Sequence, residues 1–322
     1  MLTDYNKLKE LVTEVLNKRG IEESKVIADH FVEAELRGHS SHGVQRLIPL
    51  VKGVELGTIR KELCFEVIRE TNDSILVDGM HSIGISLWNM LAEKEFGDTI
   101  SIIAVRNASH VGFLGYYTEK VAKKGKVGIM IGNAEPAVVK PGSSDKILST
   151  TPISIAIPSK IPLILDMALA STSRGKIIEA SRKGYKIPYG VAVDKNGEIT
   201  DEPESALNGG IMPLGGEKGF YLMLALELLV SYLSGSAVGP QVKGVLNTEN
   251  PPNKGEIMII INPRYLESKE DSLEFMRNII KSELPGEHGL KMREIKMKRG
   301  IEIDDKLYSI IQELNNKVPY FK

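Results

Sequence analysis

The chain has 322 residues, of which 42% are hydrophobic and 26% charged, with a formal net charge of −1 and one cysteine, Cys64. This composition is typical of a globular protein long enough to divide into two lobes. The near-zero charge argues against a nucleic acid or an anionic membrane as partner, and a lone cysteine excludes an internal disulfide and a CxxC zinc site.

The first sixty residues show a helical pattern and no predicted strand. Apolar residues recur at helical spacing, and Gly20 and Gly38 stop the first two helices. The predicted helices cover 8–16, 26–38 and 47–54.

From residue 63 onward, strands and helices alternate. The run 100–105 is mostly β-branched, as in strands buried on both faces. Further strands are predicted over 65–68, 75–78, 127–131, 153–157, 163–166 and 257–261. Helices are predicted over 83–96, 116–122, 173–182, 220–233, 273–281 and 304–315. Asn196-Gly197 predicts a two-residue hairpin turn.

The helix over 220–233 is apolar nearly all round, which predicts either deep burial or a contact with another subunit. It is too short to cross a bilayer and carries Glu227. Residues 1–10 lack the apolar run of a signal peptide. We therefore expect a cytoplasmic protein with no membrane partner.

The polar stretch 37–46 concentrates possible chemistry directly after the second helix. It reads Arg37-Gly38-His39-Ser40-Ser41-His42-Gly43-Val44-Gln45-Arg46. Its glycines and serines are poor residues for a helix interior, which favours a tight turn presenting polar side chains. Imidazole suits proton transfer near neutral pH, and an arginine can clamp a carboxylate. The alternative is a helix start capped by Ser40 or Ser41, with solvated histidines.

Polar loops also follow several predicted strands, where α/β sheets collect ligands. The loop 106–112 contains Ser109 and His110; His110 is placed as an acid, a base or a ligand contact, or it is incidental to a cap formed by Ser109. The loop 132–136 contains Glu135, which either lines a substrate pocket or is solvated.

Three further segments contain glycine with charged residues. In 171–176, hydroxyls and two cations at a helix start suit a phosphate, or simply form a Ser/Thr cap. In 213–219, three glycines around Lys218 allow close approach of a ligand, or form a plain loop. The segment 284–288 by itself indicates an exposed corner.

Several familiar signatures are missing. No GxGxxG follows a predicted strand, and there is no P-loop and no GxSxG elbow, which argues against a Rossmann site, a P-loop site and a serine hydrolase. His39 and His42 could share a metal on a helix, but no carboxylate completes a HExxH-type set, so we expect no metal.

The motifs, in this order, resemble the malate/L-lactate dehydrogenase family, which also includes L-sulfolactate and ureidoglycolate dehydrogenases. Its SHG-x-x-R turn is matched by Ser41-His42-Gly43 and Arg46, and its RN-x-x-HFG segment by Arg106-Asn107 and His110-Val111-Gly112. Further matches are its TN-x-x-P loop at 132–136, LDMA at 165–168, ARGK at 173–176 and P-x-GG-x-KG at 213–219. The match spans nearly the whole chain.

The resemblance implies an α/β, non-Rossmann NAD(P)-binding fold of the L-sulfolactate dehydrogenase type, assembled as a homodimer with active sites near the subunit contact. A mixed sheet lobe would combine with a helical lobe built from both ends of the chain. Residues 1–62 would form the N-terminal helical lobe, joined by parts of 216–322. Residues 63–215 would bind the cofactor, and 216–322 would complete both lobes.

The resemblance also implies residue roles. His42 would exchange the proton with the substrate, Ser41 would relay to it, and Arg46 would hold the substrate carboxylate. His110 would act as acid/base, as in some relatives, or contact the cofactor, as in others. The other residues expected along the groove for NAD or NADP are Val111, Gly112, Asn133, Ala134, Thr150, Asp166, Met167, Ala168, Arg174, Gly175, Lys218, Pro285, Gly286 and Glu287.

Two segments depart from the family pattern near that groove. Lys140-Pro141-Gly142-Ser143 replaces aromatic-Gly-Gly, and Ser149-Thr150-Thr151-Pro152 replaces GTNP, which leaves the preference between NAD and NADP open. The expected activity is hydride transfer between NAD(P) and a small (S)-2-hydroxy acid: malate, sulfolactate or lactate. The alternatives are an NADPH-dependent reductase of cyclic imino acids and a non-catalytic, ligand-binding oligomer.

Overall fold

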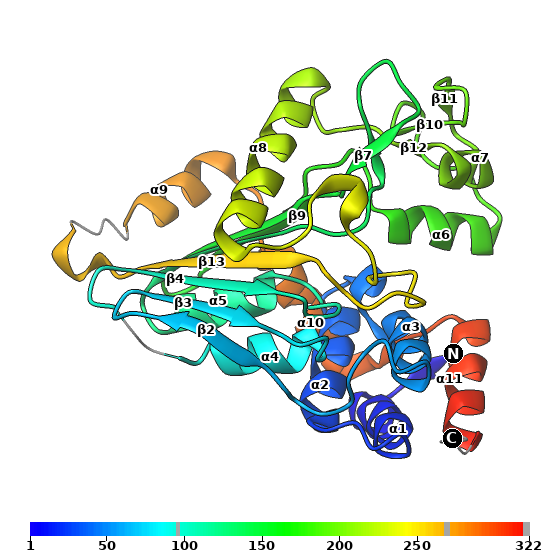
Figure 1. The fold of residues 1–322 in the computed structure, drawn as a ribbon, viewed down its shortest axis with the longest axis horizontal. Coiled ribbons are helices and arrows are strands. Elements are labelled where there is room, and N and C mark those ends of the chain that lie inside the picture. The colour runs from blue at the N-terminus through cyan, green and yellow to red at the C-terminus, as the bar shows by residue number, and fades with distance from the viewer. Residues whose placement is uncertain (95–96, 267–270, 318–322) are drawn as a thin grey trace.

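The computed structural model describes residues 1–94, 97–266 and 271–317, and its largest element is a seven-stranded mixed sheet (Figure 1). The strand order is β2-β3-β4-β13-β5-β8-β9. The strands are β2 (Glu66–Glu70), β3 (Ser74–Asp78), β4 (Ile100–Arg106), β5 (Val127–Gly132), β8 (Pro152–Ile157), β9 (Leu163–Ala168) and β13 (Gly255–Ile261). β3 pairs with β4 in parallel, and the other neighbours are antiparallel.

The strand register brings several loops to one edge of this sheet. Gly255, at the start of β13, lies opposite Arg106, at the end of β4, and Glu256 lies opposite Gly132, at the end of β5. Pro152, at the start of β8, lies opposite Ala168, at the end of β9. The polar loops that follow β4, β5 and β9 and precede β8 and β13 therefore share one side of the molecule.

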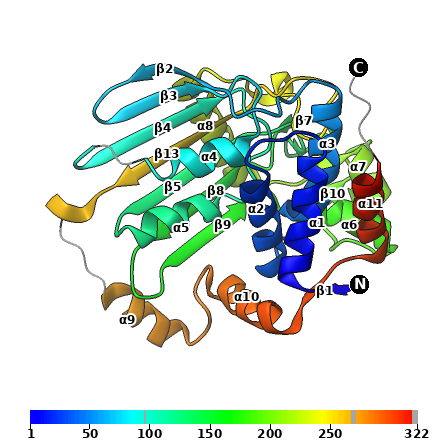
Figure 2. The ribbon, with the colours of Figure 1, turned by 90° about the horizontal axis from the view of Figure 1, so that it is seen from below.

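Helices cover both faces of the sheet (Figures 1 and 2). On one face, α4 (Gly84–Leu91) and α5 (Gly115–Lys123) contribute Trp88 and Tyr117 to a buried cluster with Met258 of β13. On the other, Val230 of α8 (Glu217–Ser234) packs against Ile257. Ile257 and Met258 are consecutive, so they point to opposite faces, as the pleat of a strand requires.

A second core joins the two ends of the chain, as expected of the helical lobe. Its helices are α1 (Tyr5–Asn17), α2 (Ser24–Leu36), α3 (Leu47–Glu55) and α11 (Asp305–Asn316). A two-stranded sheet pairs β1 (Leu2–Thr3) with β14 (Ile301–Glu302), so the prediction of no strand in the first sixty residues is wrong. Two residues are too few to produce an alternating pattern. Figure 2 shows the N-terminus near α1 and α11.

A smaller sheet lies beyond the site edge, in the order β11-β10-β12-β6-β7. The helices α6 (Arg174–Lys183) and α7 (Pro203–Asn208) lie beside this sheet. Its strands are β6 (Val138–Val139), β7 (Lys146–Leu148), β10 (Ala192–Val193), β11 (Ile199–Thr200) and β12 (Gly210–Ile211). The predicted two-residue turn at Asn196-Gly197 is a longer loop, because the Asp194 amide donates to the Glu198 carbonyl at 2.8 Å and Gly197 takes the left-handed conformation.

Two of the remaining helices differ from the prediction made from the sequence patterns. α4 ends at Leu91 rather than at residue 96, and residues 95–96 lie outside the described residues. α9 (Asp271–Ile280) matches its prediction, whereas α10 (Glu287–Arg299) was not predicted. Its apolar residues are too sparse to mark a buried face. Among the described residues, no helix combines the length and apolarity that crossing a membrane requires.

Candidate active site

The stretch 37–46 forms two short 3-10 turns, Ser40–His42 and Val44–Arg46, rather than a capped helix. Neither turn has a side-chain cap, so the alternative of a capping serine is wrong. The turn is fixed from α2, where Oε1 of the buried Glu35 accepts a hydrogen bond from the Val44 amide at 2.9 Å. A side chain at Gly43 would overlap the Glu35 carboxylate, which explains the glycine.

The turn and the loop after β4 bring a serine, two histidines and an arginine together. The Ser41 hydroxyl lies 3.0 Å from Nδ1 of His42, and the Arg46 guanidinium donates from Nε to the Ser41 carbonyl at 2.7 Å. The rings of His42 and His110 stack with their centroids 5.7 Å apart and an angle of 17° between planes. The two histidines lie side by side although 68 positions separate them in the sequence.

Burial controls the charge of these groups. It lowers the pKa of His42 and His110 well below the ordinary 6.5, and the Arg46 cation lowers both pKa values further. The pKa of Arg46 falls to about 10 through burial and the nearby Arg174, so Arg46 remains charged at neutral pH. The site therefore combines two neutral imidazoles with a fixed cation, which can exchange a proton and hold an anion.

A cavity of about 450 Å³ runs along the site edge of the large sheet, which is the size of a small-molecule site. It is lined by fourteen of the predicted residues: Ser41, His42, Arg46, His110, Val111, Gly112, Asn133, Ala134, Thr150, Asp166, Met167, Ala168, Arg174 and Gly175. Nε2 of His110 is buried and has no hydrogen-bond partner among the described residues. A ligand in the cavity would supply one.

Four predicted residues do not line this cavity. Lys218 is exposed in the first turn of α8. Pro285, Gly286 and Glu287 precede or begin α10, where the Pro285 carbonyl accepts from the Ile164 amide and Glu287 pairs with Arg277. Their roles toward the cofactor stay predictions.

Two carboxylates, of Glu135 and the buried Glu227, hold the loops around the cavity. Oε1 of Glu135 accepts from the amides of Val245, Leu246 and Asn247 at 2.9, 3.3 and 3.3 Å. Glu135 is therefore a loop anchor as well as a lining residue. Oε1 of Glu227 accepts from the Ser149 amide and hydroxyl and from the Thr151 hydroxyl, which fixes Thr150 between them.

Burial and a backbone hydrogen bond determine the position and the pKa of the Asp166 carboxyl. Its Oδ2 accepts from the Gly115 amide at 2.8 Å, and burial raises its pKa to about 6. This carboxyl therefore joins the end of β9 to the start of α5.

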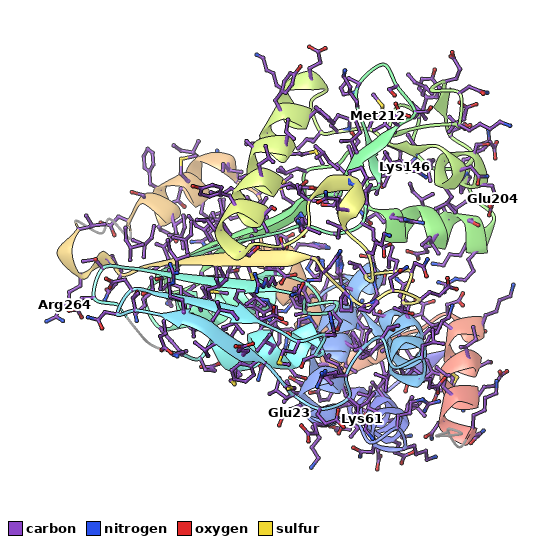
Figure 3. All side chains as sticks on the ribbon, viewed as in Figure 1. Glu23, Lys61, Lys146, Glu204, Met212 and Arg264 are labelled. Atoms are coloured by element: carbon purple, nitrogen blue, oxygen red, sulfur yellow. The ribbon has the colours of Figure 1, made fainter. Side chains whose placement is uncertain are left out.

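One part of the cavity wall, at the start of α6, is cationic. Ser173 caps α6 by accepting from the Lys176 amide, and Arg174 and Lys176 both line the cavity. Lys146 of β7, labelled in Figure 3, lies close enough to Arg174 for that cation, together with burial, to lower the pKa of Lys146. An anionic group fits this part of the wall.

Sequence reasoning missed two charged residues that line the cavity, Lys254 and Glu256. They form a buried ion pair at the start of β13. The available signal was a charged pair two positions apart at the start of an otherwise apolar run, because residues at i and i+2 of an extended segment share one face.

We find no group of histidine, cysteine or acidic side chains arranged for a metal ion within residues 1–94, 97–266 and 271–317. His42 has His110 and Ser41 as neighbours and no carboxylate in the ligand arrangement that a metal requires.

Comparison with known proteins identifies the family of this chain. Residues 3–312 match the family model described as malate/L-lactate dehydrogenase. The L-sulfolactate dehydrogenase of Methanocaldococcus jannaschii is 39% identical, over 96% of this chain and 95% of that protein. The malate/(S)-sulfolactate dehydrogenase of Methanothermus fervidus is 36% identical, over 99% and 98%.

A more distant relative is named for a different activity. The Δ1-pyrroline-2-carboxylate/Δ1-piperideine-2-carboxylate reductase of Pseudomonas putida is 26% identical, over 96% of each chain. Among solved structures, the sulfolactate dehydrogenase from M. jannaschii superposes with a TM-score of 0.87 and 37% identity, covering 99% of this chain and 97% of that one.

Proposed function

The chain belongs to the malate/L-lactate dehydrogenase family, and from this premise we propose that it is an NAD(P)-dependent dehydrogenase of small (S)-2-hydroxy acids. The observation that carries the proposal is the placement of His42, His110 and Arg46 on one cavity. Malate and sulfolactate are the first substrates to test, because they appear in the names of the relatives. Lactate is the third.

The cavity fits a nicotinamide cofactor beside such a substrate. The cavity is lined by the histidine pair, by the apolar residues Ala134, Met167 and Ala168 and by the cation of Arg174, and Nε2 of His110 has no hydrogen-bond partner among the described residues. Bound NAD or NADP supplies the hydride acceptor, and the protein supplies orientation and proton transfer.

His42 is the proposed acid/base. In the oxidation direction, the neutral imidazole takes the substrate hydroxyl proton, and in the reduction direction the imidazolium returns it. Ser41, at Nδ1, orients the ring and leaves Nε2 for the substrate oxygen. His110 stacks on this ring and borders the same ligand space.

Arg46 is the proposed carboxylate clamp. Its Nε is used by the Ser41 carbonyl, so the terminal NH groups remain to hold the substrate C1 carboxylate. Arg46 and His42 both contact Ser41, one through its carbonyl and the other through its hydroxyl. The carboxylate clamp and the proton-transfer group therefore keep a fixed position relative to each other.

A homodimer is the second part of the proposal. α8 leaves Tyr221, Leu228 and Tyr232 61%, 49% and 87% exposed, so the prediction of deep burial is wrong and the predicted subunit contact remains. A contiguous apolar surface of this kind is typical of an interface. Sedimentation should give a dimer for the wild-type protein and a monomer for Tyr232→Asp, while Tyr189→Asp, at an exposed residue of the loop between α6 and β10, should stay dimeric.

A side-by-side assay tests the activity. Oxaloacetate, sulfopyruvate, pyruvate and Δ1-piperideine-2-carboxylate should be offered with NADH and with NADPH. We expect the highest kcat/KM with a 2-oxo acid. The imino-acid reductase named among the relatives is the second candidate, and a preference for the cyclic imine would establish it instead. No turnover and no cofactor-induced rise in Tm would favour the non-catalytic alternative.

A further inference from the structure

A buried ion pair lies at the start of β13, on a different element from His42 and Arg46. Lys254 immediately precedes the strand, Glu256 is its second residue, and their side chains are 3% and 1% exposed. The ammonium and the carboxylate are in contact. Both residues line the cavity that contains His42 and His110.

The backbone around this pair is firmly held. The Lys254 carbonyl accepts from the Asn107 amide at 3.0 Å, next to β4. Oδ1 of Asn133 accepts from the Gly255 amide at 2.8 Å, next to β5. The two flanking loops therefore fix the point from which the lysine side chain enters the cavity.

Glu256 is anchored from the core. Its Oε2 accepts from Nε1 of Trp88 at 3.2 Å, and the Trp88 side chain is fully buried in α4. Its other oxygen faces Lys254. A buried ammonium is costly without a counter-charge, and burial lowers the pKa of Lys254 to about 7. Glu256 supplies that counter-charge and leaves the ammonium at the cavity wall.

Lys254 and Arg46 are both close to His110. Each cation contributes to the lowered pKa of that imidazole, and all three residues line one cavity. The lysine belongs to the sheet, whereas the arginine belongs to the turn after α2. The ligand space beside the histidines therefore has cations from two separate elements.

We propose that Lys254 binds the second anionic group of a dianionic 2-hydroxy acid, while Arg46 holds its C1 carboxylate. Glu256 is the positioning residue for the ammonium. The group bound would be the carboxylate or sulfonate on C3 of the substrate, where lactate has only a hydrogen. This inference rests on the proposed dehydrogenase function and assigns its substrate class.

The test compares wild type with Lys254→Met in the reduction of oxaloacetate, sulfopyruvate and pyruvate. We expect kcat/KM for the two dianions to fall about 10- to 100-fold, the value of a hydrogen bond to a charged group, mainly through KM. The value for pyruvate should change less than about threefold. Lys243→Met, an exposed lysine on the preceding loop, is the matched control and should behave as wild type.

A double variant separates binding from folding. Lys254→Met alone leaves the Glu256 carboxylate buried and unpaired, so Lys254→Met/Glu256→Gln should recover Tm but not the KM for oxaloacetate. Equal losses for oxaloacetate and pyruvate, or recovery of the oxaloacetate KM in the double variant, would overturn the inference. If wild type does not reduce pyruvate, a loss for oxaloacetate in kcat alone would overturn it.

The proposed function fails in a different way. It fails if wild type reduces none of the three 2-oxo acids. The inference about Lys254 fails if wild type reduces them and the substitution does not discriminate between dianions and the monoanion.

Discussion

The hydroxyl of Ser41 lies 3.0 Å from Nδ1 of His42, and this contact determines which ring nitrogen can serve a substrate. Nδ1 is occupied by its sequence neighbour, and no described residue hydrogen-bonds Nε2. The ring is further confined by stacking on His110. An imidazole held in this way has one nitrogen for structure and one for proton transfer.

Removal of the Ser41 hydroxyl should impair proton transfer without affecting the cofactor. Ser41→Ala loses one hydrogen bond to the His42 ring, so we expect kcat to fall about 5- to 10-fold. Steady-state kinetics together with the Kd for NADH or NADPH, from fluorescence, measure the two effects. Ser40→Ala is the matched control on the same turn, and a similar loss there would refute a specific role for Ser41.

Arg46 should not tolerate lysine. The planar guanidinium uses Nε for the Ser41 carbonyl and keeps its outer NH groups for a carboxylate, a geometry that an ammonium cannot reproduce. We expect Arg46→Lys to lower kcat/KM for the 2-oxo acid about 100-fold. Unchanged kinetics would place the substrate carboxylate elsewhere. Arg60→Lys, at an exposed position, controls for the change of side chain.

Glu35 should be required as a hydrogen-bond acceptor rather than as a charge. Burial raises its pKa to about 7, and its Oε1 accepts from the Val44 amide. Glu35→Gln keeps an acceptor and should keep activity. Glu35→Ala leaves that amide unpaired beside a new cavity, and we expect the free energy of unfolding to fall by about 2–4 kcal/mol. Equal urea-unfolding curves for both variants would contradict this role.

His30 should make the protein less stable in mild acid. It is fully buried, accepts from the Phe113 amide at 3.1 Å, and burial lowers its pKa to about 3. As the pH falls below 6.5, the unfolded chain gains a proton at this residue and the folded chain does not. Stability is therefore lost between pH 6.5 and about 3, by about 1.4 kcal/mol at pH 5.5 for one such group.

The comparison of wild type with His30→Gln isolates this effect. Glu35 and Asp166 have raised pKa values and act in the opposite direction, but they are present in both proteins. The loss of unfolding free energy between pH 7.5 and 5.5 should be smaller in the variant by about 1.4 kcal/mol. Equal pH dependence in the two proteins would show that His30 takes up its proton in the folded state.

Much of this fold follows from local sequence. The continuous run of β4 and the glycine stop of α1 are visible in the residues themselves, and the predicted ranges agree with the structure. α10 was missed because its apolar residues do not form one clear stripe, and β1 because two residues cannot show a period. Exposed apolar side chains on α8 look the same in a sequence whether a core or a subunit covers them.

Within the cavity, sequence motifs predicted the residues of the loops and of the end of β9, and missed Lys254 and Glu256 at the start of β13. Ser41, His42 and Arg46 are adjacent in the chain, so their conjunction can be read directly. Lys254 and His110 are brought together only by the antiparallel register of β13 with β4. Pairing registers are set by long-range packing, which the sequence patterns did not specify.

Replacement of His42 by alanine tests the central claim most directly. The variant should bind NADH or NADPH with a Kd within about threefold of wild type, while kcat falls about 10²- to 10⁴-fold through loss of the acid/base. His288→Ala, at a side chain that is 74% exposed, should leave both quantities unchanged. Turnover close to wild type in His42→Ala, or equal losses of turnover and cofactor affinity, would contradict the account.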